Sequence, residues 1–516
     1  MSSFLRTLGF TSNPFSSYVA EKEPDIEQYF VKPPYYSEIL ARGKTANSFI
    51  LFGARGSGKS ASRIAFYKAC WKRRKQGKSA PLAIVLDDYQ RILSSGLDKV
   101  DVGSFVEEVA FLVLEGLLVW LSALGPSERE IYVDGLTSNE LELVVEFLKR
   151  FYFDRPQLTR ATSAKQALRL LNQAWPTELK LWVEKKWDAL ADLIANLSTA
   201  LANRASQAET GLLPGLRDLL KLNKAQLSNS EYARALLSKL VDVSKVFEFD
   251  GIVVLIDKVD ETSKTNNSAA STARLLYPLM STTQLLEVDD FGWLVFFWDK
   301  VKELYGPNEQ GVRIDKIANA TIQWPERFLV ELVDKRLAFF SQHAITSFTQ
   351  LCSEELRQRL ILNEIIRMSM NSPRELIRIL DITIREHDES GTDGLLVGST
   401  VESALDKYVI ERLPSLYPKQ VLQQVSRINQ LQFTNSDLQP IFKTDAQNVR
   451  NRIKRWQDCG IVGQVGSRPA QGGQQGRDAY LYAVIDSRVH RLISRSLVLG
   501  PEYAAGEDVD DLEPAQ

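Results

Sequence analysis

The chain has 516 residues, 44% hydrophobic and 25% charged, a balance typical of a globular protein and unlike disordered or collagen-like chains. This length predicts roughly two to four domains, each large enough to bury its own core. The formal net charge of -2 excludes a polycation that wraps nucleic acid by bulk attraction, so charge has to be compared segment by segment.

Cysteine and histidine are rare in this chain. Cys70, Cys352 and Cys459 stand alone without CxxC spacing, which argues against a disulfide framework and a structural zinc site. The three histidines are too far apart in sequence for a typical three-histidine zinc site. These features fit a reducing, cytoplasmic compartment, and the N-terminus shows no export signal.

The longest apolar stretch, residues 105–124, is interrupted by Glu107, Glu108 and Glu115. A membrane helix would leave these carboxylates in hydrocarbon. The stretch is therefore predicted to be a buried helix of a soluble protein, and no membrane partner is expected.

Taken in chain order, the expected elements begin with an aromatic and proline-rich arm over residues 1–45. Short apolar runs bounded by polar residues then predict five strands, at 48–52, 82–88, 252–257, 293–298 and 320–324. Because these runs lack polar alternation, they indicate a parallel sheet covered by helices on both faces. The predicted fold class is therefore α/β.

The remaining segments complete the expected domain organisation. Residues 46–327 would form the α/β domain, with a helical insertion at about 100–247 between the second and third strands. Residues 328–413 read as a helical domain and 414–500 as a compact basic domain, followed by an acidic, disordered tail at 501–516.

A phosphate-binding loop follows the first predicted strand and precedes a helical pattern. Its residues match G-x-x-x-x-G-K-[ST] in full: Gly53, Ala54, Arg55, Gly56, Ser57, Gly58, Lys59 and Ser60. Glycines allow backbone N–H groups to converge on phosphate oxygens, and the helix N-terminus adds positive potential. Lys59 is expected to reach the β and γ phosphates and Ser60 to ligate Mg²⁺, which predicts ATP and Mg²⁺ as cofactors.

A second motif is the apolar run 252–256 followed by Asp257, whose carboxylate is expected to hold Mg²⁺ through water. Many buried strands end in aspartate, so this motif gains its weight from the phosphate loop. Together the two motifs make the chain resemble an AAA+ type P-loop ATPase, nearest to the origin-recognition and archaeal initiator group and its bacterial relatives. The resemblance covers roughly residues 1–490.

The resemblance implies a water-activating glutamate directly after the magnesium aspartate, but this chain has Lys258 there. Asp260 or Glu261 is the expected replacement, and a solvated acidic turn is the alternative. Hydrolysis is therefore less firmly predicted than ATP binding.

The resemblance also implies a polar residue at the end of the fourth strand that senses the γ phosphate, here Asp299 or its neighbour Lys300. Because phosphate and carboxylate repel, an aspartate would act through water or magnesium.

Two arginines match further family positions. Arg313 would reach a neighbouring subunit's γ phosphate in a nucleotide-dependent homo-oligomer, and a local salt bridge with Asp315 is the alternative. Arg374, after Pro373 in the helical lid domain, would point to the nucleotide within one subunit.

In the N-terminal arm, Tyr29, Phe30, Val31 and Pro33 lie where similar ATPases line the adenine pocket. Simple core packing is the alternative for these residues.

The C-terminal segment 411–500 concentrates positive charge, with thirteen Lys or Arg against six Asp or Glu. Two capping-box patterns predict a helix-turn-helix, and the strands at 460–462 and 479–484 predict a hairpin wing. These features predict a winged helix, as in the initiator ATPases the chain resembles. The residues expected to contact DNA are Gln447, Asn451, Lys454, Arg455, Arg468 and Arg477.

Two functions are compatible with these features. The first is an ATPase whose nucleotide state controls assembly on double-stranded DNA. The second is a switch ATPase that relays a signal to an effector protein, for example in bacterial antiviral defence, with the winged helix as a protein-interaction module.

Overall fold

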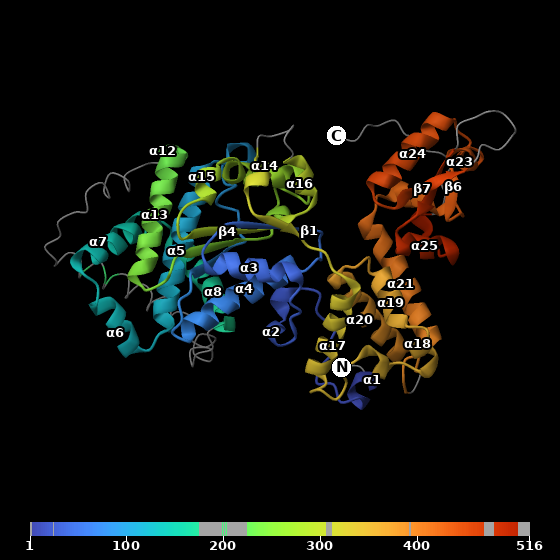
Figure 1. The fold of residues 1–516 in the computed structure, drawn as a ribbon, viewed down its shortest axis with the longest axis horizontal. Helices are drawn as coiled ribbons and strands as arrows, with labels where there is room; N and C mark the ends of the chain where they lie inside the picture. The colour runs from blue at the N-terminus through green and yellow to red at the C-terminus, as the bar shows by residue number, and fades with distance from the viewer. Residues whose placement is uncertain are drawn as a thin grey trace. The chain divides into compact units, whose positions relative to one another are not determined.

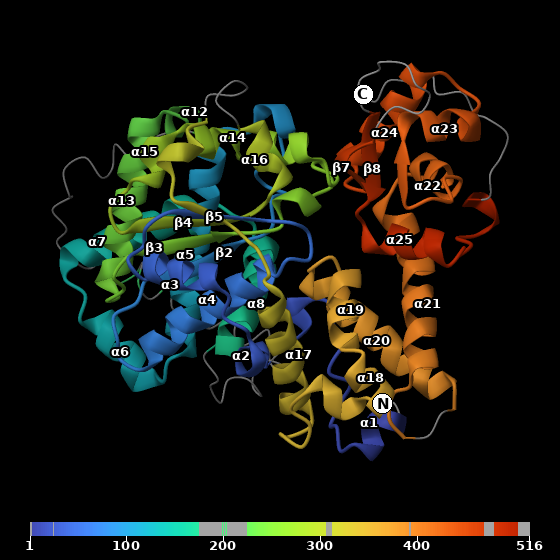
Figure 2. The ribbon, with the colours of Figure 1, turned by 45° about the vertical axis from the view of Figure 1, so that its right-hand side comes forward.

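The computed structural model describes residues 3–23, 25–174, 199, 201, 203, 224–305, 312–391, 394–468 and 479–503. These residues divide into two compact units, one of residues 20–323 and one that joins residues 1–19 to 324–516 (Figures 1 and 2). The predicted acidic tail beyond residue 503 lies outside the described residues. No helix in these ranges is long and apolar enough to cross a membrane.

The first unit is built on a five-stranded parallel sheet with the order β2-β3-β4-β1-β5. Its strands are β1 (Phe49–Gly53), β2 (Leu82–Leu86), β3 (Ile252–Ile256), β4 (Phe291–Trp298) and β5 (Asn319–Thr321). Every residue of β1 and β3 is buried, as expected for strands covered on both faces. The predicted α/β fold with a parallel sheet is confirmed.

Helices cover both faces of this sheet. In both views α3 and α4 lie on one side, and α14 and α16 lie on the other (Figures 1 and 2). The helices near the sheet are α2 (Ile26–Tyr29), α3 (Pro34–Lys44), α4 (Lys59–Lys75), α14 (Ala269–Ser281), α15 (Thr283–Leu286) and α16 (Lys300–Leu304).

The chain between β2 and β3 is helical wherever it forms regular structure in the described residues. Its elements are α5 (Val102–Ala123), α6 (Pro126–Asp134), α7 (Ser138–Phe147), the π-helical turn η3 (Leu148–Tyr152), α8 (Gln157–Ala174), α12 (Lys224–Leu227) and α13 (Ser230–Val246). The apolar stretch predicted as a buried helix is α5, which Asp101 caps by accepting a hydrogen bond from the Ser104 backbone N–H. Glu108 and Glu115 are buried on it.

The second unit begins with a helical bundle. Its helices are α1 (Ser3–Thr7), α17 (Glu326–Phe340), α18 (Glu354–Gln358), α19 (Ile361–Met368), α20 (Pro373–Glu389) and α21 (Gly398–Leu416). The N-terminal residues are fastened to this bundle because Asp381 accepts from Asn13 Nδ2 at 2.8 Å and from the Tyr18 hydroxyl at 2.5 Å. Phe4 also packs edge-on against the His387 ring.

The second unit ends with a small antiparallel sheet of order β6-β8-β7 and its helices. In chain order these elements are α22 (Lys419–Ser426), β6 (Gln432–Thr434), α23 (Asn435–Phe442), α24 (Ala446–Asp458), β7 (Val462–Arg468), β8 (Ala479–Val484) and α25 (Ser487–Ser494). The order helix, strand, helix, helix, strand, strand is the one expected of a winged helix. The predicted capping box at Thr434 forms, since the Thr434 side chain accepts from Asp437 N. The second helix begins one residue later than the predicted box at Thr444–Gln447, because its cap is Asp445, whose side chain accepts from Asn448 N.

Candidate nucleotide site

The phosphate loop connects β1 to α4 in the geometry its sequence predicts. Gly56 and Gly58 have φ angles of 79° and 89°, which are favourable for glycine and strained for other residues. Lys59 opens α4, and its Nζ donates to the carbonyl oxygens of Gly53 at 2.6 Å and Ala54 at 2.9 Å. The lysine ammonium is thus held against the loop at the N-terminal end of a helix, where phosphate groups are favoured.

Three aspartates follow the carboxyl ends of neighbouring strands. Asp87 follows β2, Asp257 follows β3 and Asp299 follows β4. Since the strands are parallel, these ends meet at the edge of the sheet that also carries the phosphate loop. Ligands of open α/β sheets bind at this edge.

Asp257 is 2% exposed and belongs to a partly buried ion cluster that the sequence did not predict. Arg63, on α4 and 1% exposed, donates from Nε to Asp257 Oδ2 at 2.9 Å. The same guanidinium pairs with Glu21 Oε1 at 3.0 Å and lies 3.9 Å from Asp87 Oδ2. Lys258 Nζ completes the group, at 2.9 Å from Glu21 and 3.8 Å from Asp87. We call these five residues the Arg63 cluster.

The charges of the Arg63 cluster are mutually stabilising. Burial alone would lower the pKa of Arg63, but the carboxylates of Asp257, Asp87 and Glu21 raise it. Three carboxylates face two cations, so one net negative charge remains. That charge is suited to a divalent cation nearby.

The cluster assigns a structural task to Lys258. This residue has a φ of 59° at the N-terminal end of the short helix η4 (Val259–Glu261), and its backbone N–H donates to Asp257 Oδ1 at 2.9 Å. Where the resemblance implies a glutamate, the chain therefore has a cation that neutralises Glu21 from the N-terminal segment.

Glu21 provides a pH test of the cluster. Burial alone would raise the pKa of Glu21, but the hydrogen bond and charge of Lys258 and the charge of Arg63 lower it below its usual value. Stability from this shift is therefore present above the unfolded-state pKa and is lost as the pH falls through the folded-state pKa. Glu21→Gln is expected to lower stability at pH 7 by on the order of 1 kcal/mol and to flatten the acid side of the stability profile.

Thermal unfolding of both proteins between pH 3 and pH 7 measures this difference. Glu303→Gln, on α16 and outside the Arg63 cluster, is the control. If the stability of Glu21→Gln depends on pH in the same way as that of the wild type, the assigned role of Glu21 is contradicted.

Asp260 is held by the phosphate loop itself. Arg55 Nε donates to Asp260 Oδ2 at 2.9 Å, and its Nη2 donates to Asn267 Oδ1 at 2.7 Å. The Arg55 guanidinium also lies 4.3 Å from the centre of the Trp298 ring. The structure thus links the predicted water-activating residue to the loop, and Glu261 lies next to it on η4.

Asp299 lies beside the start of the phosphate loop, because its backbone N–H approaches the Gly53 carbonyl oxygen at 3.3 Å. Its side chain accepts from Lys300 N at 2.9 Å, and Lys300 Nζ lies 5.6 Å from the Trp298 ring centre. Both predicted sensor residues are therefore placed at the same edge of the sheet as Asp257.

The two predicted arginines have different surroundings. Arg313 is exposed and forms two hydrogen bonds with Asp315, at 2.9 and 2.7 Å. This is the local salt bridge that was the alternative to a role between subunits. Arg374 lies half-buried in the first turn of α20, in the second unit, where the Ser372 side chain caps the helix.

The aromatic residues of the arm pack into the core. Tyr29 and Val31 are each 3% exposed, and the Tyr29 hydroxyl donates to Glu23 at 2.7 Å. Phe30 contacts the Tyr36 ring edge-on. These contacts are those of the core-packing alternative, while the predicted contact with adenine stays a prediction.

In the C-terminal domain, the predicted faces of α24 are confirmed. Val449, Ile453 and Trp456 are buried. The predicted DNA-contacting residues that are exposed are Gln447, Asn451, Lys454, Arg455 and Arg468. Arg477 lies outside the described residues.

Part of the local positive charge is used inside the second unit. Arg412 pairs with Glu375, and Arg491 pairs with Glu402 and Asp406. These carboxylates lie before residue 411, outside the basic segment. The exposed cations on the outer face of α24, Lys454 and Arg455, are therefore a better guide to DNA binding than the total charge of the segment.

Arg63, Glu21 and Asp87 are the site residues that sequence reasoning missed. The only signal in the sequence was that Arg63 lies within the apolar helical pattern after the loop. Its partners come from segments 42 and 194 positions away. No local pattern could connect them.

No family model and no curated protein matches the sequence. Among solved structures, the chain is similar to the Aeropyrum pernix ORC1 protein in complex with DNA, with 11% identity, a TM-score of 0.38, and coverage of 93% of this chain and 96% of that one. It is also similar to the Aeropyrum pernix ORC2 protein in ADPNP–ADP complexes, with 10% identity, a TM-score of 0.39, and coverage of 95% and 98%.

A third similar structure is CDC6p from Pyrobaculum aerophilum, with 11% identity, a TM-score of 0.32, and coverage of 95% of this chain and 100% of that one. At these values the likeness carries no argument about activity.

Proposed function

We propose that the chain is an AAA+ type ATPase that binds Mg²⁺-ATP at the phosphate loop and contacts double-stranded DNA through its C-terminal winged helix. The observation that carries the proposal is the placement of Lys59 and the Asp257 carboxylate at one edge of the parallel sheet. Lys59 supplies a cation for the β and γ phosphates, and Ser60 supplies a hydroxyl for magnesium.

The residues present fit a bound magnesium ion. Asp257 accepts one hydrogen bond at each carboxylate oxygen, from Arg63 and from Lys258 N, and each oxygen has a second lone pair for a metal-bound water. When bound, Mg²⁺ neutralises charge on the β and γ phosphates. The task of the protein is to orient the phosphates with Lys59 and the loop N–H groups.

Hydrolysis requires a group that orients the attacking water, and Asp260 and Glu261 are the proposed candidates. Because Arg55 binds Asp260, that carboxylate has to share its lone pairs between the guanidinium and water. We therefore expect slow turnover.

An ATP-hydrolysis assay with and without duplex DNA tests the proposed function. The wild type is expected to hydrolyse ATP slowly and to speed up when DNA is present, while Lys59→Ala stays at background. The hydrolysis rates of Asp260→Asn and Glu261→Gln should show how much each carboxylate contributes to turnover. Turnover that is unchanged in both of these variants would rule out the proposed bases.

DNA binding is expected to depend on salt and on the outer face of α24. Each phosphate contact releases counterions and contributes roughly 0.9 to the slope of log affinity against log salt. Changing Lys454 and Arg455 together to alanine should therefore reduce that slope by up to about two. Fluorescence anisotropy with a labelled duplex, from about 50 to 200 mM salt, measures both slopes.

A matched control for this prediction is the pair Lys165→Ala and Arg169→Ala, which removes an exposed lysine and arginine from α8. It should leave the slope unchanged. If the full chain shows no DNA binding at low salt, the winged helix is better explained as a protein-interaction module.

The ion pairs of Arg412 and Arg491 favour the protein-interaction function, because they neutralise positive charge that would otherwise be available to DNA phosphates. In that case the chain relays its nucleotide state to an effector protein, as in the proposed antiviral switch. Pull-down with nucleotide-loaded wild type and Lys59→Ala would distinguish a nucleotide-dependent partner from background.

Self-association through Arg313 is the proposed source of a homo-oligomer. To reach another subunit's nucleotide, Arg313 has to leave Asp315, an exchange that costs little because both side chains are exposed. Sedimentation velocity with a non-hydrolysable ATP analogue should show larger species for the wild type than for Arg313→Ala. If the wild type and Arg313→Ala both sediment as monomers, the proposed self-association is contradicted.

A further inference from the structure

A cavity lies on the side of the edge strand β2. Its volume is about 600 Å³, a size suited to a small organic molecule. The walls come from β2, α4, α5 and α8, and none of the eight phosphate-loop residues lines it. The apolar part of the lining includes Trp71, Ile84, Leu112, Val119, Leu170 and Leu171.

The polar feature of this cavity is Glu115, which is 1% exposed. Its Oε2 accepts a hydrogen bond from the Ser163 hydroxyl at 2.5 Å. Its Oε1 is buried and has no hydrogen-bond partner among the described residues. Buried polar atoms of native proteins are rarely left in this state, so the atom calls for a donor from a ligand.

Arg155, the cation whose charge acts on Glu115, is already paired with another residue. Arg155 forms two hydrogen bonds with Glu108, at 3.2 and 2.8 Å, and its guanidinium packs over the Phe111 ring. The Arg155–Glu108 pair is therefore internally neutral, and Glu115 has no ion-pair partner of its own within the described residues.

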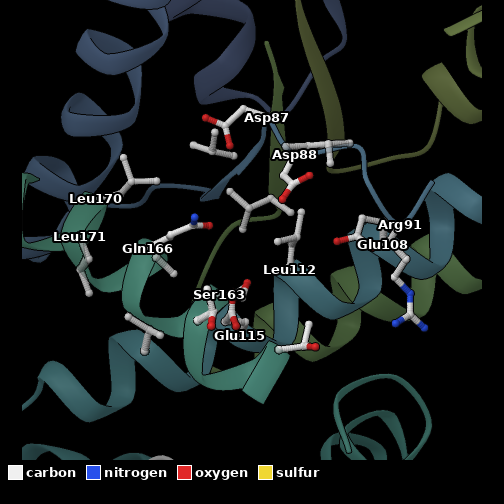
Figure 3. A pocket seen from close by; sticks show the side chains of 18 of the residues that line it. Asp87, Asp88, Arg91, Glu108, Leu112, Glu115, Ser163, Gln166, Leu170 and Leu171 are labelled. Atoms are coloured by element: carbon white, nitrogen blue, oxygen red, sulfur yellow. Dashed lines mark hydrogen bonds between the residues drawn. The ribbon is translucent and has the colours of Figure 1, made fainter. Parts of the chain in front are cut away.

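Figure 3 shows Glu115 beside Ser163 on one side of the cavity and Asp87 and Asp88 on the opposite side. Apart from the Arg155–Glu108 pair and Asp87, which belongs to the Arg63 cluster, the acidic or basic lining residues are Asp88, Glu115 and the exposed Arg91. A carboxylate ligand would bring a further acceptor to Glu115, whereas an ammonium group brings the donor that Glu115 Oε1 lacks.

We propose that this cavity binds a small organic amine, with its ammonium group donating to Glu115 and its apolar body lying against Ile84, Val119 and Leu171. The ammonium supplies the donor that Glu115 Oε1 needs. The apolar walls supply the contact area, and the proposal does not depend on the nucleotide site.

The titration of Glu115 supports the same reading. Burial raises the pKa of Glu115 to about 8, with Ser163 and Arg155 opposing the shift and Glu108 adding to it. At neutral pH the carboxyl is therefore mostly protonated. When an amine binds as an ammonium ion, the carboxyl proton is released to solvent and the Glu115 carboxylate pairs with the ammonium group.

Isothermal titration of the full chain with three matched probes tests the proposal: 4-phenylbutylamine, 4-phenylbutanol and 4-phenylbutyrate. The wild type is expected to bind the amine at least about tenfold more tightly than the alcohol, and the carboxylate most weakly. Glu115→Gln, which keeps the shape of the side chain, should remove the preference for the amine.

Glu142→Gln is the matched control, because Glu142 is a buried glutamate on α7 that does not line the cavity. It should bind like the wild type. Ala167→Phe fills the cavity from α8 and should weaken the amine and the alcohol alike, which keeps the test decisive if Glu115→Gln fails to fold. Equal affinity of the wild type for amine and alcohol, unchanged amine binding by Glu115→Gln or by Ala167→Phe, or no amine binding at millimolar concentration would overturn the proposal.

Discussion

Lys59→Ala is expected to weaken ATP binding by about 10- to 100-fold, because a charge-assisted hydrogen bond is worth roughly 1.5–3 kcal/mol and each 1.4 kcal/mol is a factor of ten. The Lys59 ammonium lies against the loop carbonyl oxygens of Gly53 and Ala54 and would exchange them for phosphate oxygens. Alanine removes the lysine that opens α4 beside the loop glycines.

The shift in unfolding temperature caused by a fixed, high ATP concentration measures this effect, since a ligand at free concentration L that binds only the folded state stabilises it by RT ln(1 + L/Kd). The shift should be large for the wild type and small for Lys59→Ala. Lys72→Ala, an exposed lysine on the same helix, is the control and should keep the full shift. Equal shifts in all three proteins would show that the loop does not bind the nucleotide.

Arg63→Met is expected to lower the free energy of unfolding by roughly 3–5 kcal/mol, the usual cost of removing one partner from a buried ion pair. The cost arises because Asp257 and Glu21 would lose the guanidinium that neutralises them, and Asp257 is almost completely buried. Chemical denaturation of the full chain measures the change.

Two further variants separate charge from shape in this experiment. Arg73→Met removes an arginine of the same helix that bonds only to the Ser79 carbonyl oxygen in the described structure, and should cost much less. The double variant Arg63→Met with Asp257→Asn should be less destabilised than the sum of the single changes, since neither charge is then left alone. The cluster as described would be contradicted if Arg63→Met lowers the free energy of unfolding by less than about 1 kcal/mol. Strict additivity of the Arg63→Met and Asp257→Asn effects in the double variant would contradict it as well.

The local features of the nucleotide site could be predicted from sequence. A loop with glycines at fixed spacing, the apolar run before it and the run that ends at Asp257 are all short-range patterns, and each depends on residues next to one another in the chain. The same is true of α24, where the spacing of Val449, Ile453 and Trp456 defines the buried face.

The features that could not be predicted depend on contacts between distant segments. Arg63 reads as part of an apolar helix, and only the fold brings Glu21 and Asp87 to it. The cavity around Glu115 is similar, because its walls come from four separate elements. Lys258 was predictable only in part. Its departure from the family pattern is visible in the sequence, but its pairing with Glu21 is not.

Direct titration of Mg²⁺-ATP into the purified full chain tests the central claim most closely. The phosphate loop and Asp257 predict saturable binding of one nucleotide per chain, which weakens when Mg²⁺ is removed by a chelator and when Lys59 is changed to alanine. Absence of saturable binding at millimolar ATP, or binding of equal strength with and without both Mg²⁺ and Lys59, would contradict the account.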